Sequence, residues 1–305
     1  MPLSLEERLR SFRAARQAPA PASPLARDLF GGTEVAAPEG TYYLIERAYA
    51  ERFELPAPGL ERLRRNLRLL YGIGPRTEEK LRARGIDSLE QLLETERWSE
   101  RAGVILRAIA ARDLAYLRRS GAGDRDLLSF FDPRDMVFID IETTGLYGVL
   151  PLFLVGLLHV DGDGLRLVQF LARRYEEEAA LLCAVAETLP RFKTIVSYNG
   201  RAFDLPYLKA RLLAHRLSCP LDHLHVDLLP HARRRYRGIL SDCRLCTVEA
   251  AALGGPGRED DVPGHLIPEL YHRFVQTQDP ALIRGIIEHN ALDLLALARL
   301  IRLLE

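Results

Sequence analysis

One stretch of the sequence, residues 136–146, constrains the fold more than any other. Four apolar residues run directly into Asp140 and Glu142, and the apolar pattern ends at Thr143-Thr144-Gly145. An apolar run that is closed by a glycine turn is typical of a buried β-strand. Because side chains alternate along a strand, Asp140 and Glu142 leave the same face near its end. Neighbouring carboxylates raise each other's pKa unless a cation lies between them, so this stretch predicts half of a metal site.

The size and composition of the chain indicate a two-domain globular protein. Its 305 residues exceed the usual length of one domain, and 48% of them are hydrophobic, which is ample for a core. The formal net charge is zero, which argues against a strongly basic nucleic-acid binder but allows local basic patches. Arginine supplies nearly all of the basic residues, a bias that we attribute to a GC-rich genome.

The cysteines and the absence of long apolar stretches bear on the cellular compartment. No stretch approaches the length that spans a membrane, and the chain does not start with the apolar segment of a signal peptide. The four cysteines are Cys183, Cys219, Cys243 and Cys246. They are too few for a disulfide framework, and although Cys243 and Cys246 have the spacing of half a zinc site, we interpret all four as buried free thiols. We therefore expect a reduced, cytoplasmic protein with no membrane partner.

Changes in composition and pattern divide the chain into four segments. We expect an N-terminal arm with a short strand-rich segment at 1–58, a small helical domain at 59–120, a linker at 121–133 and an α/β domain at 134–305. The arm contains alternating Ala and Pro, and the linker begins beside a Ser-Gly-Ala-Gly run. In the last segment, two strand patterns at 152–160 and 165–171 are joined by Asp-Gly-Asp-Gly, a strong hairpin signal. Alternating helices and strands follow, which predicts a mixed sheet with flanking helices.

A glycine-rich hairpin lies at the centre of the predicted helical domain. Gly72-Ile73-Gly74-Pro75 separates two helical patterns, and Thr77 is the expected N-cap of the second helix. This segment resembles the helix-hairpin-helix family, which implies binding of a nucleic-acid backbone without sequence preference. Gly72 and Gly74 would let backbone N–H groups approach a phosphate, and Lys80 would add positive charge. The alternative is a tight connector that packs on a neighbouring domain.

Two further acidic signals follow the first strand. Asn199 ends a predicted strand, and Asp204 opens a helix near Phe203. Taken alone, Asp204 could simply stabilise the positive end of that helix. His289 and Asp293 lie four residues apart on the last long helix and share a face that also carries apolar residues. Since burying such a pair is costly, the two side chains either satisfy each other or serve a metal.

Together the three signals resemble the ordered motifs of the DEDD 3′–5′ exonucleases, which share a ribonuclease H-like fold. The resemblance covers residues 134–305, and within that superfamily the chain is similar to YprB-type ribonuclease H-like proteins. The supporting stretches are Val226-Asp-Leu-Leu229, Thr247-Val-Glu249 and Arg258-Glu-Asp-Asp-Val-Pro-Gly264. The resemblance implies hydrolysis of single-stranded DNA or RNA from the 3′ end. The alternative is a nucleic-acid-binding or adaptor protein with a vestigial nuclease site.

The same resemblance assigns roles to individual residues. Asp140, Glu142, Asp204 and Asp293 would hold two Mg²⁺ or Mn²⁺ ions about 3.5–4 Å apart. His289 would act as the general base. However, the superfamily usually has a Tyr four residues before the last Asp, or a His five before it, and this chain has a His at the Tyr spacing. The base is therefore either His289 alone or His289 with help from Asn290.

Residues around the predicted metal site complete the set of candidates. By resemblance, Thr143, Leu146 and Asn199 would lie beside the terminal nucleotide, although the Thr143 and Thr144 hydroxyls could instead cap the turn. The Gly-rich loop 254–261 is expected at the surface, the alternative being that Arg258 binds a phosphate. Asp227 and Glu249 are expected to be structural partners of arginines.

Overall fold

The structure, a computed structural model, describes residues 30–53, 59–254, 258 and 261–304. Contacts divide the chain into two compact units. The larger unit comprises Met1–Glu54 with Pro133–Leu303, and the smaller comprises Leu55–Asp132 with Leu304–Glu305. The arm expected at the N-terminus, residues 1–29, lies outside the described residues.

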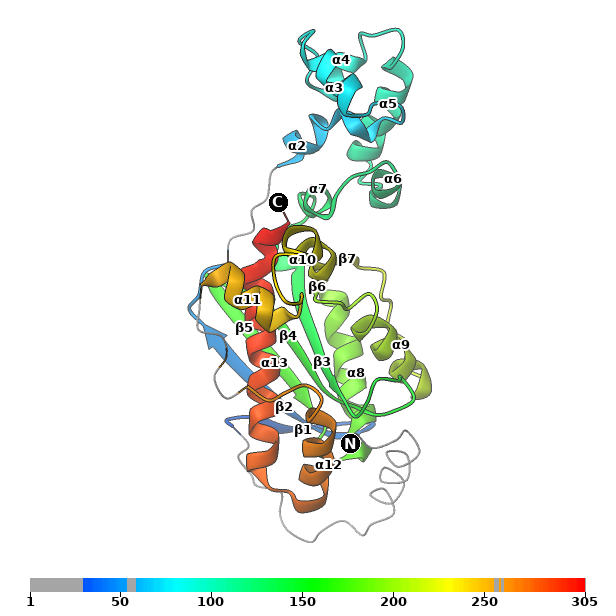
Figure 1. The fold of residues 1–305 in the computed structure, drawn as a ribbon. Helices are drawn as coiled ribbons and strands as arrows, with labels where there is room; N and C mark the ends of the chain where they lie inside the picture. Colours follow the sequence, from blue (N-terminus) through cyan, green and yellow to red (C-terminus); the bar gives the residue numbers. More distant parts are fainter. Residues whose placement is uncertain (1–29, 54–58, 255–257, 259–260, 305) are drawn as a thin grey trace. The chain divides into compact units, whose positions relative to one another are not determined.

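A mixed sheet forms the centre of the larger unit. Among the described residues it has seven strands in the order β1-β2-β5-β4-β3-β6-β7 (Figure 1). The strands are β1 (Thr33–Ala37), β2 (Gly40–Tyr49), β3 (Met136–Thr143), β4 (Leu152–Asp161), β5 (Gly164–Leu171), β6 (Thr194–Ser197) and β7 (Leu224–Asp227). The central strand β3 pairs antiparallel with β4 and parallel with β6. The expected mixed sheet with flanking helices is confirmed.

The sheet extends further towards the N-terminus than the sequence suggested. Strand β2 pairs antiparallel with β5 from Tyr43 to Tyr49, and the side chains of Tyr43 and Ile45 are 1% and 0% exposed. The expectation of a separate segment at 1–58 is therefore wrong for β1 and β2. Their alternation is short, and β5, the strand that joins β2 to the rest of the sheet, lies more than 100 residues away in sequence. Local periodicity therefore gives no hint of this pairing.

Helices cover both faces of this sheet. They are α8 (Glu178–Thr188), α9 (Asp204–Ala214), α10 (Leu228–Tyr236), α11 (Leu245–Leu253), α12 (Ile267–Thr277) and α13 (Pro280–Leu300), with 3₁₀ turns at Pro133–Asp135, Tyr175–Glu177, Leu189–Arg191 and Ile301–Leu303. The long helix α13 packs against β3 and β4, and α8 lies on the other face of the sheet (Figure 1). None of the helices described here is both long and apolar enough to cross a bilayer.

The smaller unit is helical, as expected. It contains α2 (Leu60–Arg64), a 3₁₀ turn (Leu67–Leu69), α3 (Pro75–Arg82), α4 (Leu89–Leu92), α5 (Ser99–Ala110), α6 (Leu114–Arg119) and α7 (Asp124–Leu128). Gly72 turns the hairpin with φ +95°, a conformation that suits glycine. Helix α3 starts at Pro75 with Gly74 as its N-cap, so the expected cap at Thr77 is wrong. Proline at the first helical position already has a helical φ and needs no N–H partner.

The predicted linker at 121–133 is also wrong, because part of it folds into the smaller unit. It contains helix α7, in which Leu127 is fully buried and Asp126 is 7% exposed. Asp126 pairs with Arg62 of α2 at 3.2 Å. The glycines that suggested a flexible linker instead form the turn before α7, where Gly121 has φ +100°.

Candidate metal centre and nuclease site

The centre of the candidate site is the end of β3. Asp140 lies beside α13, where the buried Asn290 donates hydrogen bonds to the Asp140 side-chain Oδ2 at 2.7 Å and to its backbone carbonyl at 3.2 Å. Gln169 of β5 donates to the Asn290 Oδ1 atom at 2.9 Å. The amide side chains of Asn290 on α13 and Gln169 on β5 thus fix the orientation of the Asp140 carboxylate.

A glycine permits this contact between helix and sheet. Gly156 on β4 lies opposite Asp140 in the register of the sheet. A Cβ atom at Gly156 would lie 2.1 Å from Asn290 Oδ1 and 2.5 Å from Leu294 Cδ1. Any larger residue would push α13 away from the strand. A glycine inside a strand pattern often marks such a close approach, although the sequence does not say which element approaches.

Asp204 enters the site from the first residue of α9. The preceding turn needs Asn199 at φ +66°, which asparagine tolerates better than most residues. It also needs Gly200, where a Cβ would lie 2.3 Å from Ser197 Oγ. Asp227 secures the turn by accepting the backbone N–H groups of Asn199 and Arg201 at 2.8 and 3.1 Å. Asp227 is therefore structural, as expected, but its partners here are backbone amides.

The four predicted ligands influence one another electrostatically. Burial, followed by the carboxylates of Asp293, Glu142 and Asp204, raises the pKa of Asp140 well above its ordinary value. Burial and the carboxylates of Asp293 and Asp204 do the same to the pKa of Glu142. Burial is also the main reason why the pKa of Asp204 rises to about 7. The structure therefore brings the three sequence signals together as one cluster of like charges.

An arginine that the sequence analysis expected at the surface lies in this cluster. The Arg258 side chain is 10% exposed, and its Nη1 atom contacts Asp293 Oδ1 at 2.5 Å and Asp261 Oδ2 at 3.2 Å. Its Nε atom donates to Glu249 Oε2 at 2.9 Å. Burial alone would lower the pKa of Arg258, but the carboxylates of Asp293 and Glu249 more than offset this and raise it. The expected arginine partner of Glu249 is confirmed, whereas the surface position of Arg258 is wrong.

His289 is oriented by Asp261, whose role the sequence did not predict. Its Nδ1 atom lies 2.6 Å from Asp261 Oδ1, and its Nε2 atom lies 3.7 Å from Asp293 Oδ2. Since a carboxylate accepts hydrogen bonds, Nδ1 is the donor in the contact with Asp261. Asp261 lies inside the stretch 258–264, but nothing in its spacing links it to His289.

The donor set suits a hard divalent cation. Carboxylate oxygens are the ligands that Mg²⁺ and Mn²⁺ prefer, and like charges that raise one another's pKa are stabilised by a cation between them. However, no group of three or more His, Cys, Asp or Glu side chains in the described part of the chain is arranged to hold one ion together. Asp293 is bound to Arg258, and Asp140 is bound to Asn290. The chemistry of these residues therefore fits such an ion, and to bind one Asp293 would have to leave its arginine partner.

The predicted substrate-binding residues come from both units, three from the larger unit and three from the hairpin of the smaller unit. In the larger unit, Leu146 is 75% exposed and Asn199 is also exposed, so both can meet a ligand. The Thr143 and Thr144 hydroxyls instead donate to the carbonyls of Gly145 and Pro151 at 2.7 and 3.0 Å, which agrees with the turn-capping alternative.

The hairpin residues and the cysteines are mostly accessible to solvent. Gly72, Gly74 and Lys80 are exposed and belong to the smaller unit. The described cysteines are free thiols, as expected. None of them is fully buried, and Cys246 is exposed, so that part of the prediction is wrong.

The fold and the family assignment agree. A sequence model of the RNase_H superfamily matches residues 137–305, which is more than half of the chain. The chain therefore belongs to the RNase_H superfamily.

Two relatives are similar in sequence to about half of this chain. Protein YprB of Bacillus subtilis is 36% identical over 174 residues, which cover 56% of this chain and 42% of that protein. Protein MJ0365 of Methanocaldococcus jannaschii is 31% identical over 170 residues, covering 51% of this chain and 87% of that protein. The chain thus matches less than half the length of YprB.

Two solved structures resemble part of this chain. A family B DNA polymerase from Pyrobaculum calidifontis matches with a TM-score of 0.42 and 19% identity over 53% of this chain and 23% of the polymerase. The zinc-bound form of an E. coli ExoI–ssDNA complex matches with a TM-score of 0.32 and 19% identity over 53% of this chain and 45% of that chain.

Proposed function

We propose that the chain is a metal-dependent 3′–5′ exonuclease that hydrolyses phosphodiester bonds of single-stranded DNA or RNA. One observation carries this proposal: Asp140, Glu142, Asp204 and Asp293 come from β3, α9 and α13 and form one electrostatic cluster. Membership of the RNase_H superfamily supports a nuclease.

In this proposal the four carboxylates hold two Mg²⁺ or Mn²⁺ ions. When bound, the two ions stabilise the charge that develops on the phosphodiester and make the attacking water more acidic. The protein contributes the fixed positions of its ligands. Asn290 holds Asp140 by its amide, and Asp204 is the first residue of α9. Asp293 would have to leave Arg258 before it could bind an ion.

His289 is the proposed proton acceptor. The contact between its Nδ1 atom and Asp261 fixes the ring and leaves Nε2 to take a proton from the attacking water. This pairing supports His289 as the base despite its unusual spacing. Asn290 is bound to Asp140 and Gln169 and has no spare basic atom, so it has a positioning role.

We further propose that Leu146 and Asn199 contact the terminal nucleotide. The hairpin residues Gly72 and Gly74, with Lys80, would bind the nucleic-acid backbone. Exposure of the hairpin and the start of α3 at Pro75 support this part of the proposal. Arg76→Ala combined with Lys80→Ala should then weaken binding at low salt without changing the fold.

Asp140→Asn tests the nuclease proposal. The substitution keeps the shape of the side chain but removes a charge that a metal needs, so hydrolysis of end-labelled DNA and RNA should fall by at least about 1,000-fold. The matched control is Asp163→Asn, which changes an exposed carboxylate in the β4–β5 turn. Full activity of the Asp140 variant, or of the unchanged protein in excess EDTA, would contradict the proposal. Tight binding without turnover on any substrate would favour a vestigial nuclease site.

A further inference from the structure

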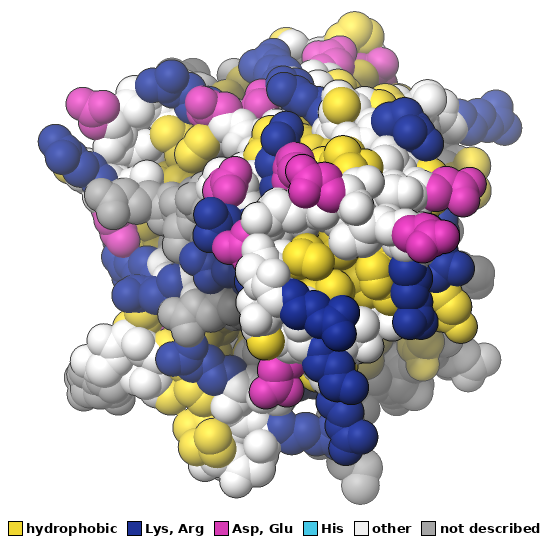
Figure 2. Space-filling model, turned by 90° about the horizontal axis from the view of Figure 1, so that it is seen from above, with side chains coloured by type: hydrophobic (Ala, Val, Ile, Leu, Met, Phe, Trp, Pro, Cys, Tyr) yellow, Lys and Arg dark blue, Asp and Glu magenta, His cyan; other side chains and the backbone are white. Residues whose placement is uncertain are grey.

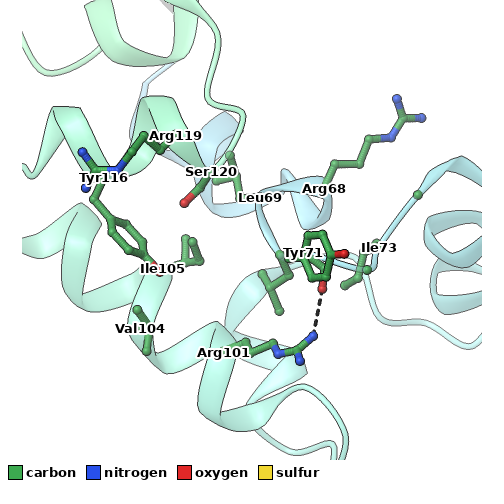
Figure 3. A pocket seen from close by; sticks show the side chains of 13 residues that line it. Arg68, Leu69, Tyr71, Ile73, Arg101, Val104, Ile105, Tyr116, Arg119 and Ser120 are labelled. Carbon is green, nitrogen blue, oxygen red and sulfur yellow. Dashed lines mark hydrogen bonds between the residues drawn. The ribbon is translucent and has the colours of Figure 1, made fainter.

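The smaller unit contains a pocket that the hairpin residues alone do not explain. It has a volume of about 650 Å³ and lies between the hairpin, α5 and α6 (Figure 3). Val104 and Ile105 of α5 provide part of its wall, and Gly74, the N-cap of α3, is also among its lining residues. A cavity of this size matches the volume of a small organic ligand or one nucleotide.

The polar lining of the pocket is basic. Three arginines and no acidic residue line it. Arg68 is neutralised by Glu78 at 2.5 Å, and its side chain points away from the other two in Figure 3. Arg101 donates to the backbone carbonyl of Tyr71 at 2.9 Å, a neutral partner that leaves its charge uncompensated. The guanidinium carbon Cζ of Arg119 lies 5.9 Å from the centre of the Tyr116 ring. In the described part of the chain neither Arg101 nor Arg119 pairs with a carboxylate, so both are available to an anion.

Two tyrosines give the pocket aromatic surfaces. Tyr71 is 90% exposed, an unusual position for a large ring beside the buried Leu70 and Ile73. Tyr116 is half-buried and comes from α6, on a different side of the pocket from Tyr71 (Figure 3). Such rings stack with unpaired bases, and the combination of arginine with exposed aromatic rings is typical of sites for single-stranded nucleic acid.

The pocket differs from the general surface in its charge. In the space-filling view, Lys and Arg side chains are interspersed with Asp and Glu over the face shown (Figure 2). The chain as a whole carries no net formal charge. A polyanion therefore gains little from the average field of the protein and must bind where basic groups lack acidic neighbours.

We propose that this pocket binds one unpaired nucleotide of a single-stranded nucleic acid. The base lies against the ring of Tyr116, with Tyr71 at the rim, and Arg101 and Arg119 contact the adjacent phosphates. A base within a duplex is already stacked and cannot enter, so the pocket selects single strands. This inference deepens the proposed function because it rests on a nucleic-acid substrate, yet it concerns residues remote in sequence from the carboxylate cluster.

Binding of fluorescent 20-nucleotide single strands to the full-length protein in EDTA tests the proposal. Fluorescence anisotropy should show that Tyr116→Ala weakens binding of single-stranded DNA or RNA about tenfold, whereas Tyr116→Phe, which keeps the ring, binds as the unchanged protein does. Arg101→Gln with Arg119→Gln should also weaken binding and reduce the salt dependence by about two counterions. Arg107→Gln, an exposed arginine of α5 outside the pocket, is the matched control and should have no effect.

Three outcomes would overturn the proposal. In the first, Tyr116→Ala binds single strands as tightly as the unchanged protein. In the second, Tyr116→Ala loses as much affinity for duplexes as for single strands. In the third, the unchanged protein binds a free mononucleotide as tightly as the 20-nucleotide strand. Separate DNA and RNA strands identify which nucleic acid responds. Circular dichroism confirms that each variant is folded, and Tyr116→Phe separates loss of the ring from loss of structure. A protein that cannot hydrolyse nucleic acid but loses binding through Tyr116→Ala would refute the nuclease proposal and leave this one intact.

Discussion

At the scale of single residues, Asn290 and Arg258 determine which partners the candidate ligands have. The Asn290 amide holds Asp140, and the Arg258 guanidinium holds Asp293 together with Glu249 and Asp261. An arginine among carboxylates neutralises charge much as a metal does. In the proposed site, Arg258 and a divalent ion would therefore compete for Asp293.

Arg258→Gln should strengthen metal binding because it removes this competitor. We expect the Mn²⁺ concentration that half-saturates the thermal stabilisation to fall on the order of tenfold, the effect of losing one close charge pair. Thermal unfolding across a Mn²⁺ series measures the change. Arg166→Gln, which alters an exposed arginine paired with Asp161, should leave the series unchanged. Unchanged or weaker Mn²⁺ binding by the Arg258 variant would show that the arginine does not compete.

At the scale of elements, a buried ion pair joins α8 to α9, the helix that starts with Asp204. Arg211 of α9 contacts both oxygens of Glu178 at 2.7 Å, and Glu178 also accepts the backbone N–H of Leu152 at 2.8 Å. Burial alone would raise the pKa of Glu178, but hydrogen bonds from His215 and Arg211 lower it below its ordinary value of 4.5. The pair thus links the sheet to both helices.

Glu178→Gln should destabilise the protein in a pH-dependent manner. At pH 7 we expect a loss of about 3 kcal/mol in the free energy of unfolding, because Arg211 remains buried without its charge partner. Since the folded-state pKa of Glu178 is lowered, its stabilisation is present above pH 4.5 and is lost as the pH falls through the folded-state pKa. Urea unfolding should therefore show a smaller difference at pH 3.5 than at pH 7. The exposed Glu176→Gln variant is the control, and an equal difference at both pH values would contradict this account.

Strand β2 offers a second test at this scale. Ile45 is fully buried, whereas Glu46 beside it is exposed and paired with Arg166. Ile45→Ala should lower the free energy of unfolding by about 3 kcal/mol, and Glu46→Ala should change it by less than about 0.5 kcal/mol. Urea unfolding measures both. A small effect of Ile45→Ala would mean that β2 is not part of the core.

At the scale of the whole molecule, the sequence predicted elements formed by neighbouring residues, but it did not predict contacts between residues far apart in the chain. The strand that ends in Asp140 and Glu142, the hairpin at Asp161–Gly164 and the sharing of one helix by His289 and Asp293 follow from periodicity and turn chemistry. The pairing of β2 with β5 does not, because residues far apart in sequence form it. The contact of Arg258 with Asp293 was missed for the same reason, because Asp293 is 35 residues away in sequence.

The candidate site, too, could be predicted only in part. Sequence motifs predicted the four carboxylates, but hydrogen bonds between elements determine which side chains they contact. Asn290 reaches Asp140 only because β4 has a glycine at position 156. Asp261 reaches His289 only after the chain returns along α12 to α13. Such contacts depend on tertiary packing, which residue spacing does not encode.

In the proposed function, the chain removes nucleotides from the 3′ end of a single strand with the help of a divalent metal. The most direct test is a time course on one 20-nucleotide strand, labelled at its 5′ end in one sample and at its 3′ end in the other. With Mg²⁺ or Mn²⁺, we expect a ladder of progressively shorter 5′-labelled products and immediate release of the 3′-labelled mononucleotide. EDTA should abolish both. Release of the 5′ label first, or no product with either metal, would contradict the proposed exonuclease activity.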